Sequence, residues 1–139
     1  DYYFISEETF QEKIRNGEFA EWEEVYRGQY YGTLRAEIDR LHAKGKCVIF
    51  DIDVNGALRL KRKYGEKCLT VFVNPPSLET LIERLQKRNT ETPESLQRRI
   101  DKAALELTFA DQFDVILQND DLEYALEEAE NVVKTFLNV

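Results

Sequence analysis

The sequence is poor in several residue types that mark particular protein classes. Its 139 residues include no methionine, two cysteines, three prolines and one histidine. Two cysteines without metal-type spacing build neither a disulfide framework nor a zinc site, so we interpret Cys47 and Cys68 as small core residues. No apolar run approaches the roughly 20 residues that span a bilayer, and no signal-peptide pattern opens the chain. We therefore expect no membrane contact and a cytoplasmic location.

Positive charge is also scarce. Lys and Arg number 19 against 27 Asp and Glu, which gives a formal net charge of -8. This balance disfavours a broad nucleic-acid interface, although a local basic site can exist within an acidic protein. The hydrophobic share of 42% and the aromatic share of 12% are typical of a folded globular domain. We expect one compact domain that does not bind nucleic acid.

Residues 46–56 (KCVIFDIDVNG) combine an unbroken apolar run with two carboxylates. The unbroken apolar run 47–50 predicts a buried strand, and Asp51 and Asp53 follow at its end. Residues two apart on a strand project to the same side, and ligands of open α/β sheets bind beyond the carboxyl ends of the strands. A helix N-cap beside a solvated acid remains the alternative for this pair.

Strand-like and helical patterns alternate along the rest of the chain. We expect further buried strands at 67–73 and 114–117, a short strand at 2–5, and a hairpin within 18–33 that turns at Arg27-Gly28. Helices are expected after Ser6, Thr33, Ser77 and Thr92, from about Ala57, and from Leu122. Such alternation predicts parallel βαβ units and an α/β fold.

The sequence lacks one common phosphate-binding motif but has arginines that could bind phosphate. The loop pattern GxxxxGK[ST], which cradles nucleotide phosphates, does not occur in the sequence. Arginines flank the polar segment 89–95 instead, and their planar guanidinium groups suit bidentate binding of phosphate oxygens. A solvated helix face is the alternative for these arginines, which are Arg84, Arg88, Arg98 and Arg99.

Seven segments together resemble the guanylate kinase family over essentially the whole chain. They are DYYFIS at 1–6, GEFAEWEEV at 17–25, YYGT at 30–33, DIDVNGA at 51–57, NPPS at 74–77, RLQKRNTET at 84–92 and NDDL at 119–122. Members of that family carry upstream a strand, a phosphate loop and a basic segment. The resemblance therefore implies a fragment that lacks its first central strand and phosphate loop. We expect these 139 residues alone to be inactive and to self-associate through unpaired strand edges.

The resemblance implies a P-loop nucleoside monophosphate kinase-like parallel sheet flanked by helices, with a small mixed GMP-binding subdomain. It places that subdomain at residues 1–33, the core α/β domain at 34–139 and a lid at about 86–97. The implied activity is phosphoryl transfer from ATP to GMP or dGMP, giving GDP, with Mg²⁺. The parent protein would be a transferase of purine nucleotide metabolism.

The resemblance also implies how the acceptor nucleotide is held. Glu21 would accept hydrogen bonds from the ring N–H and amino group of guanine, a donor pair that adenine lacks. Thr33 would contact the base edge, and Asp53 would accept from the amino group. The phosphate would be bound by two phenols beside a glycine that permits close approach, namely Tyr2, Tyr31 and Gly32. Core packing is the alternative for the two tyrosines.

The resemblance assigns the remaining residues to ATP binding and to phosphoryl transfer. Asp51 would orient the magnesium shell, directly or through water, and Asn119 would contact the adenine. Arg88 and Arg99 would reach the transferring phosphoryl group, with Arg84 as a third. The chain has Asn89 where a glycine commonly follows the lid arginine, a departure that bears on lid flexibility.

Two other functions fit parts of this pattern. A guanylate-kinase-like module that binds protein partners without catalysis would share the fold. Such modules typically lose the nucleotide-site side chains, whereas this chain keeps them, among them Glu21, Tyr31, Asp51 and Asp53. An acidic α/β domain that acts only in assembly would require all seven segments to coincide by chance. The enzyme is the reading that the residues favour.

Overall fold

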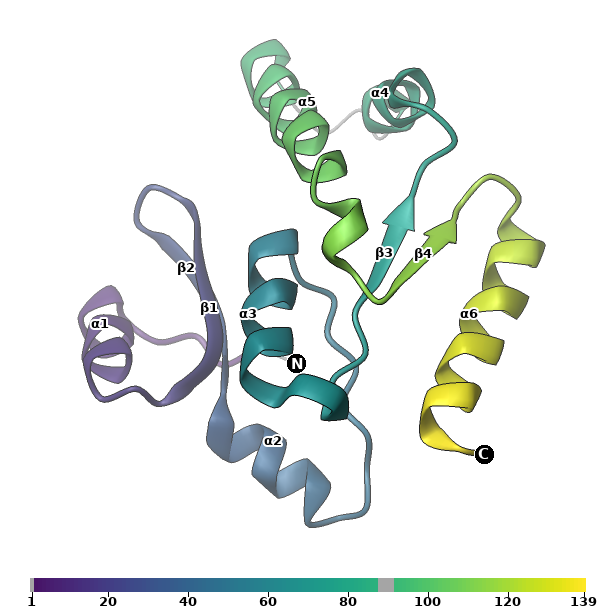
Figure 1. The fold of residues 1–139 in the computed structure, drawn as a ribbon. Helices are drawn as coiled ribbons and strands as arrows, with labels where there is room; N and C mark the ends of the chain where they lie inside the picture. The colour runs from purple at the N-terminus through teal and green to yellow at the C-terminus, as the bar shows by residue number, and fades with distance from the viewer. Residues whose placement is uncertain (1, 88–91) are drawn as a thin grey trace. The chain divides into compact units, whose positions relative to one another are not determined.

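The computed structural model describes residues 2–87 and 92–139 (Figure 1). The chain divides into two compact units, of which the first ends at Gly65 and the second runs from Glu66 to Val139. Strands and helices occur in both, which confirms the α/β class. Among the described residues, one two-stranded sheet belongs to each unit.

The first unit is built on an antiparallel hairpin. Strand β1 (Phe19–Tyr26) pairs with β2 (Gln29–Leu34), and the chain turns at Arg27-Gly28 as predicted. Gly28 has a φ of 79°, a conformation that a residue without Cβ adopts without strain. Its backbone N–H donates to the Glu24 carboxylate at 2.8 Å, which closes the turn.

Three helices surround this hairpin in the first unit: α1 (Glu7–Arg15), α2 (Arg35–His42) and α3 (Val54–Tyr64). Helix α1 begins at the predicted cap, because the Ser6 hydroxyl accepts from the Thr9 N–H at 3.2 Å. Its Phe10 ring stacks on Phe19 of β1 with centroids 4.3 Å apart. Figure 1 shows α1 and α3 on opposite sides of the hairpin. The core of the unit therefore forms where these helices bury the hairpin.

The buried strand predicted at 47–50 is wrong. These residues form no strand, Cys47 is exposed and Ile49 is 86% exposed. A strand needs a neighbour for its N–H and C=O groups, and the ladders among the described residues join only β1 to β2 and β3 to β4. The apolar run has no such neighbour and stays irregular. For the same reason Asp51 and Asp53 do not end a strand.

Three smaller expectations also need correction. Residues 2–5 form no strand. Thr33 lies within β2 and does not cap α2, whose N-cap is Leu34 without a side-chain bond. Helix α3 begins at Val54 rather than near Ala57, because the Asp53 carboxylate accepts from the Gly56 N–H at 2.8 Å and caps the helix there.

The second unit carries the parallel pair that the alternating pattern predicts. Strand β3 (Val71–Asn74) pairs in parallel with β4 (Val115–Gln118). Between them lie α4 (Leu78–Lys87) and α5 (Pro93–Leu107). Short 3₁₀ turns at Gly65–Lys67 and Ala110–Gln112 and the final helix α6 (Leu122–Leu137) complete the unit.

Side-chain hydrogen bonds fix the ends of these elements. The buried Thr70 precedes β3, and Asp114 Oδ2 accepts from both its backbone N–H and its hydroxyl at 2.8 Å. Ser77 and Thr92 cap α4 and α5 as predicted, with bonds of 3.1 and 3.3 Å. Across residues 2–87 and 92–139 no helix is both long and apolar enough to cross a membrane.

Candidate functional site

A carboxylate lies inside the hairpin of the first unit. Glu21 of β1 is only 7% exposed, whereas Glu23 and Glu24 of the same strand are less buried. It stands opposite Thr33 in the ladder, and both the hydroxyl and the backbone N–H of Thr33 hydrogen bond to its carboxylate. The hairpin therefore holds a buried acid whose direction is fixed by the neighbouring strand.

The beginning of α3 brings a second carboxylate toward Glu21. A Cβ placed on Gly56 would lie 3.5 Å from Glu21 Oε2 and 3.1 Å from Asp53 Oδ1. The two acids are near enough that the charge of Asp53 raises the pKa of Glu21. Glu21, Thr33 and Asp53, three residues predicted to read one base, therefore share one place in the structure.

Several groups shift the pKa of Glu21, and they act in opposite directions. Burial is the largest, and it raises the pKa of Glu21 because desolvation disfavours the charged form. The Thr33 hydroxyl, the charge of Arg59 and the Thr33 backbone N–H lower the pKa of Glu21 in turn. The net direction is upward from the ordinary value of 4.5. A buried acid whose pKa is shifted by burial and by neighbouring charges is a typical feature of a binding site.

The two predicted phosphate phenols lie beside each other. The rings of Tyr2 and Tyr31 meet edge to face, with centroids 6.0 Å apart and planes at 78°. Their side chains are 75% and 50% exposed, so neither is a core aromatic. Two phenol groups that face solvent together can donate to one anion.

Gly32 separates Tyr31 from Thr33, and the structure gives a reason for it that the sequence did not indicate. A Cβ at this position would lie 2.9 Å from the Glu21 carbonyl oxygen, the Trp22 Cβ and the Phe19 ring. The hairpin itself therefore excludes a side chain here. The predicted role in admitting a phosphate stays a prediction.

In the second unit, two predicted residues meet in one contact. The Arg84 guanidinium of α4 donates from Nη1 to the backbone carbonyl of Asn119 at 2.8 Å. The Asn119 N–H in turn donates to the Asn74 carbonyl at 2.8 Å, which continues the β3–β4 ladder by one bond. Arg84 thus anchors the exit of β4, where Asn119 stands.

The other two predicted arginines have different outcomes. Arg99 lies on α5 with an exposed side chain. Arg88 and the neighbouring Asn89, both within the predicted lid segment, lie outside the described residues.

Comparison with known proteins decides the family. The family model of guanylate kinase matches residues 1–136. The chain belongs to the guanylate kinase family. It is 49% identical over 138 residues to the guanylate kinase of Bacteroides thetaiotaomicron, with 99% of this chain and 68% of that protein covered. The guanylate kinase of Porphyromonas gingivalis is 45% identical over 137 residues, with 99% and 73% covered.

A solved structure agrees. The crystal structure of guanylate kinase from Anaplasma phagocytophilum superposes with a TM-score of 0.76 at 29% identity, covering 97% of this chain and 64% of that one. The chain therefore spans about two thirds of the length of these two relatives. The resemblance inferred from the seven segments is confirmed.

Mg²⁺ is the cation that the family implies. Asp51 is the residue of this chain predicted to bind it. The described residues contain no group of three or more side chains that could hold a metal. Asp51 is nevertheless exposed and next to the segment that leads into α3. Mg²⁺ keeps several waters and is commonly held by one or two carboxylates plus substrate phosphates. A single open carboxylate fits that mode.

Arg59 of α3 contacts the strand that carries Glu21, and the sequence analysis did not identify it. Its Nη2 donates to the Trp22 carbonyl at 2.6 Å and to Glu23 Oε2 at 2.7 Å, on the strand that carries Glu21. The one available signal was that α3 follows the acidic pair and is rich in basic residues. Its partners are 36 and 37 residues away, so sequence spacing alone could not identify them.

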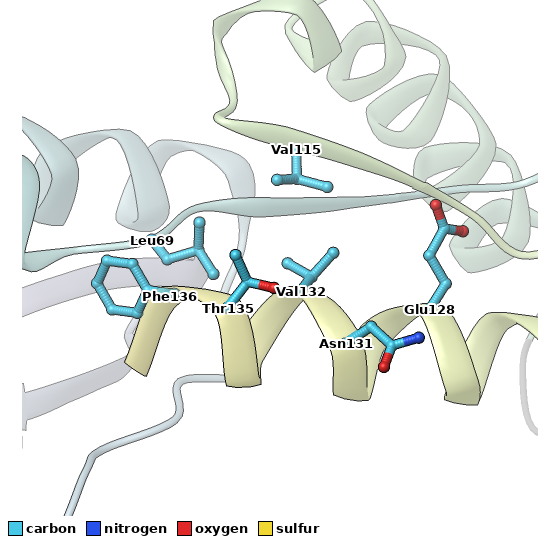
Figure 2. A pocket seen from close by; sticks show the side chains of 7 residues that line it. All are labelled: Leu69, Val115, Glu128, Asn131, Val132, Thr135 and Phe136. Carbon is cyan, nitrogen blue, oxygen red and sulfur yellow. The ribbon is translucent and has the colours of Figure 1, made fainter. Parts of the chain in front are cut away.

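The second unit has a hollow of about 360 Å³ between α6 and the strand β4. Figure 2 shows Val132, Thr135 and Phe136 of α6 beneath Val115 and beside Leu69. Glu128 and Asn131 also line it. None of the predicted site residues lines it, so it forms no part of the candidate site.

Proposed function

We propose that the protein that carries this chain is a guanylate kinase that transfers a phosphoryl group from ATP to GMP or dGMP and forms GDP. The observation that supports this best is the buried Glu21, held by Thr33 and joined by Asp53 at the start of α3. A location in the cytoplasm belongs to the same proposal.

Guanine recognition follows from the chemistry of that acid. Guanine presents a ring N–H and an amino group on one edge, whereas adenine presents a ring acceptor there. A carboxylate accepts two hydrogen bonds from guanine and would face a lone pair of adenine. Because Glu21 is desolvated, leaving it without donors is costly, and discrimination increases accordingly.

The acceptor phosphate would lie at the exposed tyrosine pair. Tyr2 and Tyr31, whose ring centroids are 6.0 Å apart, would donate from their hydroxyl groups, and both lie in the same unit as Glu21. A GMP held at both its base and its phosphate loses the freedom to turn, which accounts for a large part of the rate in phosphoryl transfer. In this proposal residues 1–33 form the GMP-binding subdomain and 34–139 the core.

The transfer needs no side-chain nucleophile, since a GMP phosphate oxygen attacks ATP. Arg84, Arg88 and Arg99 are proposed to stabilise the charge of the transferring group, and such arginines are worth roughly 10³ to 10⁵ in rate. Residues of about 86–97 would close as a lid and exclude water. Asp51 would hold Mg²⁺ through its carboxylate, and the bound ion would neutralise phosphate charge.

The test is a coupled assay of ADP formation by the full-length protein with ATP and either GMP or AMP. We expect turnover with GMP, GDP as product, and little turnover with AMP. Thermal shift gives an independent reading, in which GMP raises the melting temperature more than AMP does. Absence of both turnover and GMP stabilisation contradicts the proposal and favours the non-catalytic protein-binding module.

The 139-residue chain by itself is the second arm of this test. Because its sequence contains no GxxxxGK[ST] loop, we propose that it does not turn over ATP and GMP. Measurable GDP formation by the purified chain would contradict this second statement and leave the first intact.

A further inference from the structure

Arg59 joins helix α3 to the strand that presents Glu21. Its Nη2 lies 2.6 Å from the Trp22 carbonyl oxygen and 2.7 Å from Glu23 Oε2, the two residues that directly follow Glu21. The guanidinium is partly exposed, and the Glu23 carboxylate less so. One side chain therefore fixes both the backbone and a side chain of β1 beside the buried acid.

Helix α3 approaches Glu21 at two places. Its first turn, at Gly56, lies against the Glu21 carboxylate, as the 3.5 Å separation of a Gly56 Cβ from Oε2 indicates. Three residues further along the helix, Arg59 binds β1. The distance between strand and helix, and hence the space in front of Glu21, depends on both contacts.

The charges around Glu21 are unbalanced without Arg59. The groups that face it are Thr33 from β2, Asp53 from the N-terminus of α3 and Arg59 from the same helix. Thr33 is neutral and Asp53 is an acid. Glu23 is a further acid next to the site, and Arg59 is its ion-pair partner. Arg59 is thus the one cation among the described groups that act on Glu21.

We propose that Arg59 is a positioning residue for guanine recognition, which fixes β1 beside Glu21 and supplies the positive charge that offsets the neighbouring carboxylates. The proposal rests on the proposed function, since it concerns the same acid. In this proposal Arg59 makes no contact with the base and acts through β1 and Glu21.

A consequence follows for the protonation of Glu21. An ionised carboxylate accepts both guanine donors, whereas a protonated one presents a hydrogen of its own to them. Burial already raises the pKa of Glu21, and the charge of Arg59 opposes this rise. Removing Arg59 should raise the pKa of Glu21 further, so that guanine binding weakens at a higher pH than in the unaltered protein.

The test compares Arg59→Gln and Arg59→Lys with Arg62→Gln in the full-length protein. Arg62 lies on α3, is exposed, and its replacement removes the same charge from the same helix. For Arg59→Gln we expect KM for GMP to rise about tenfold, with kcat and KM for ATP within about twofold. The acid limb of kcat/KM for GMP should move to higher pH. Arg59→Lys should recover part of the loss, because it keeps the charge but not the planar fork.

A purely structural role predicts a different pattern. It would lower the melting temperature of Arg59→Gln while leaving KM for GMP and its pH profile as in Arg62→Gln. That result overturns the proposal. Equal effects of Arg59→Gln and Arg62→Gln would overturn it too, because they would reflect only net charge.

A nucleotide-free measurement separates this proposal from the proposed function. The Glu21 carboxyl carbon can be titrated by NMR in the unaltered protein and in Arg59→Gln. An upward shift of its pKa in the variant supports the role of Arg59 even if no kinase activity is found. An unchanged Glu21 titration overturns that role even if the protein is an active kinase.

Discussion

Glu21 and Thr33 face each other across the β1–β2 ladder, and Thr33 donates to the Glu21 carboxylate from both its hydroxyl and its backbone N–H. These bonds leave acceptor capacity on a carboxylate that has about four lone-pair sites. The acid is therefore anchored and still able to receive the donors of a ligand, which is the arrangement that selective recognition of a base requires.

Glu21→Gln should abolish the preference for GMP over AMP. Glutamine keeps the shape and one acceptor, but its amide hydrogens oppose the guanine donors. We expect the ratio of kcat/KM for GMP to that for AMP to fall by about a hundredfold or more, in line with the loss of bonds to a buried charge. The control is Glu24→Gln, an exposed residue of the same strand that keeps its acceptor for the Gly28 N–H. An unchanged ratio in Glu21→Gln refutes the assigned role.

The same substitution should stabilise the protein at neutral pH. The pKa of Glu21 is raised by burial, so between the ordinary value of 4.5 and the raised value the folded state binds more protons than the unfolded state. Stability is therefore lost as pH rises through that window, and the loss is fully present above it. The melting temperature of Glu21→Gln should exceed that of the unaltered protein near pH 7 and converge with it below the ordinary value. A difference that grows toward acid pH would contradict this.

Gly32→Ala should distort the hairpin at the base-reading residue. A Cβ there meets the Glu21 carbonyl oxygen, the Trp22 Cβ and the Phe19 ring at 2.9 Å, and two of these contacts involve parts that cannot rotate away. We expect a loss of about 1–3 kcal/mol in the free energy of unfolding and a raised KM for GMP. Gly28→Asn is the matched control, because nothing lies within 4 Å of a Cβ there and asparagine tolerates its positive φ. Equal free energies of unfolding for Gly32→Ala and the control would contradict this prediction, because the hairpin would then accommodate the added Cβ without cost.

Arg84→Gln should affect ATP more than GMP. The Arg84 bond to the Asn119 carbonyl holds the segment after β4, and Asn119 is the residue proposed to contact adenine. We expect KM for ATP to rise several-fold, about the effect of one charge-assisted hydrogen bond, with KM for GMP little changed. A fall in kcat in the same variant would report the role proposed for Arg84 at the transferring phosphoryl group. An unaltered KM for ATP together with an unaltered kcat would contradict both roles.

The 139-residue chain should self-associate in solution. Apolar side chains are exposed in both units, including Ile49 in the first and Val73 and Ile116 in the second. The strand pair β3–β4 also offers backbone groups at its edges. Light scattering over a concentration series should show a mass above 16.3 kDa that grows with concentration. A monodisperse monomer would count against this prediction.

Helix caps and the hairpin turn, which depend on residues close in sequence, were predicted from the sequence. Ser6, Ser77 and Thr92 cap the helices they were expected to cap, and the chain turns at Arg27-Gly28. Each of these depends on residues within about four positions, where side-chain geometry dominates.

Strand pairing and side-chain contacts between residues far apart in sequence could not be predicted in the same way. The apolar residues 47–50 have the composition of a buried strand, but a strand exists only with a neighbour in its ladder. Arg59 has partners 36 and 37 residues away, and no local pattern marks it. Glu21 entered the candidate site through family resemblance, while its burial and its bonds to Thr33 came only from the structure.

The hydrogen bonds between Thr70 and Asp114 have a consequence for how the second unit folds. They join residues 44 positions apart, so they can form only after a long segment has been closed, at an entropic cost that rises with about the logarithm of its length. Helices α4 and α5 lie within that segment, and helices form in about a microsecond. Prior helix formation shortens the flexible path between the two strands. We therefore expect the hydrogen bonds between Thr70 and Asp114 to form after α4 and α5, at the stage when β3 and β4 pair.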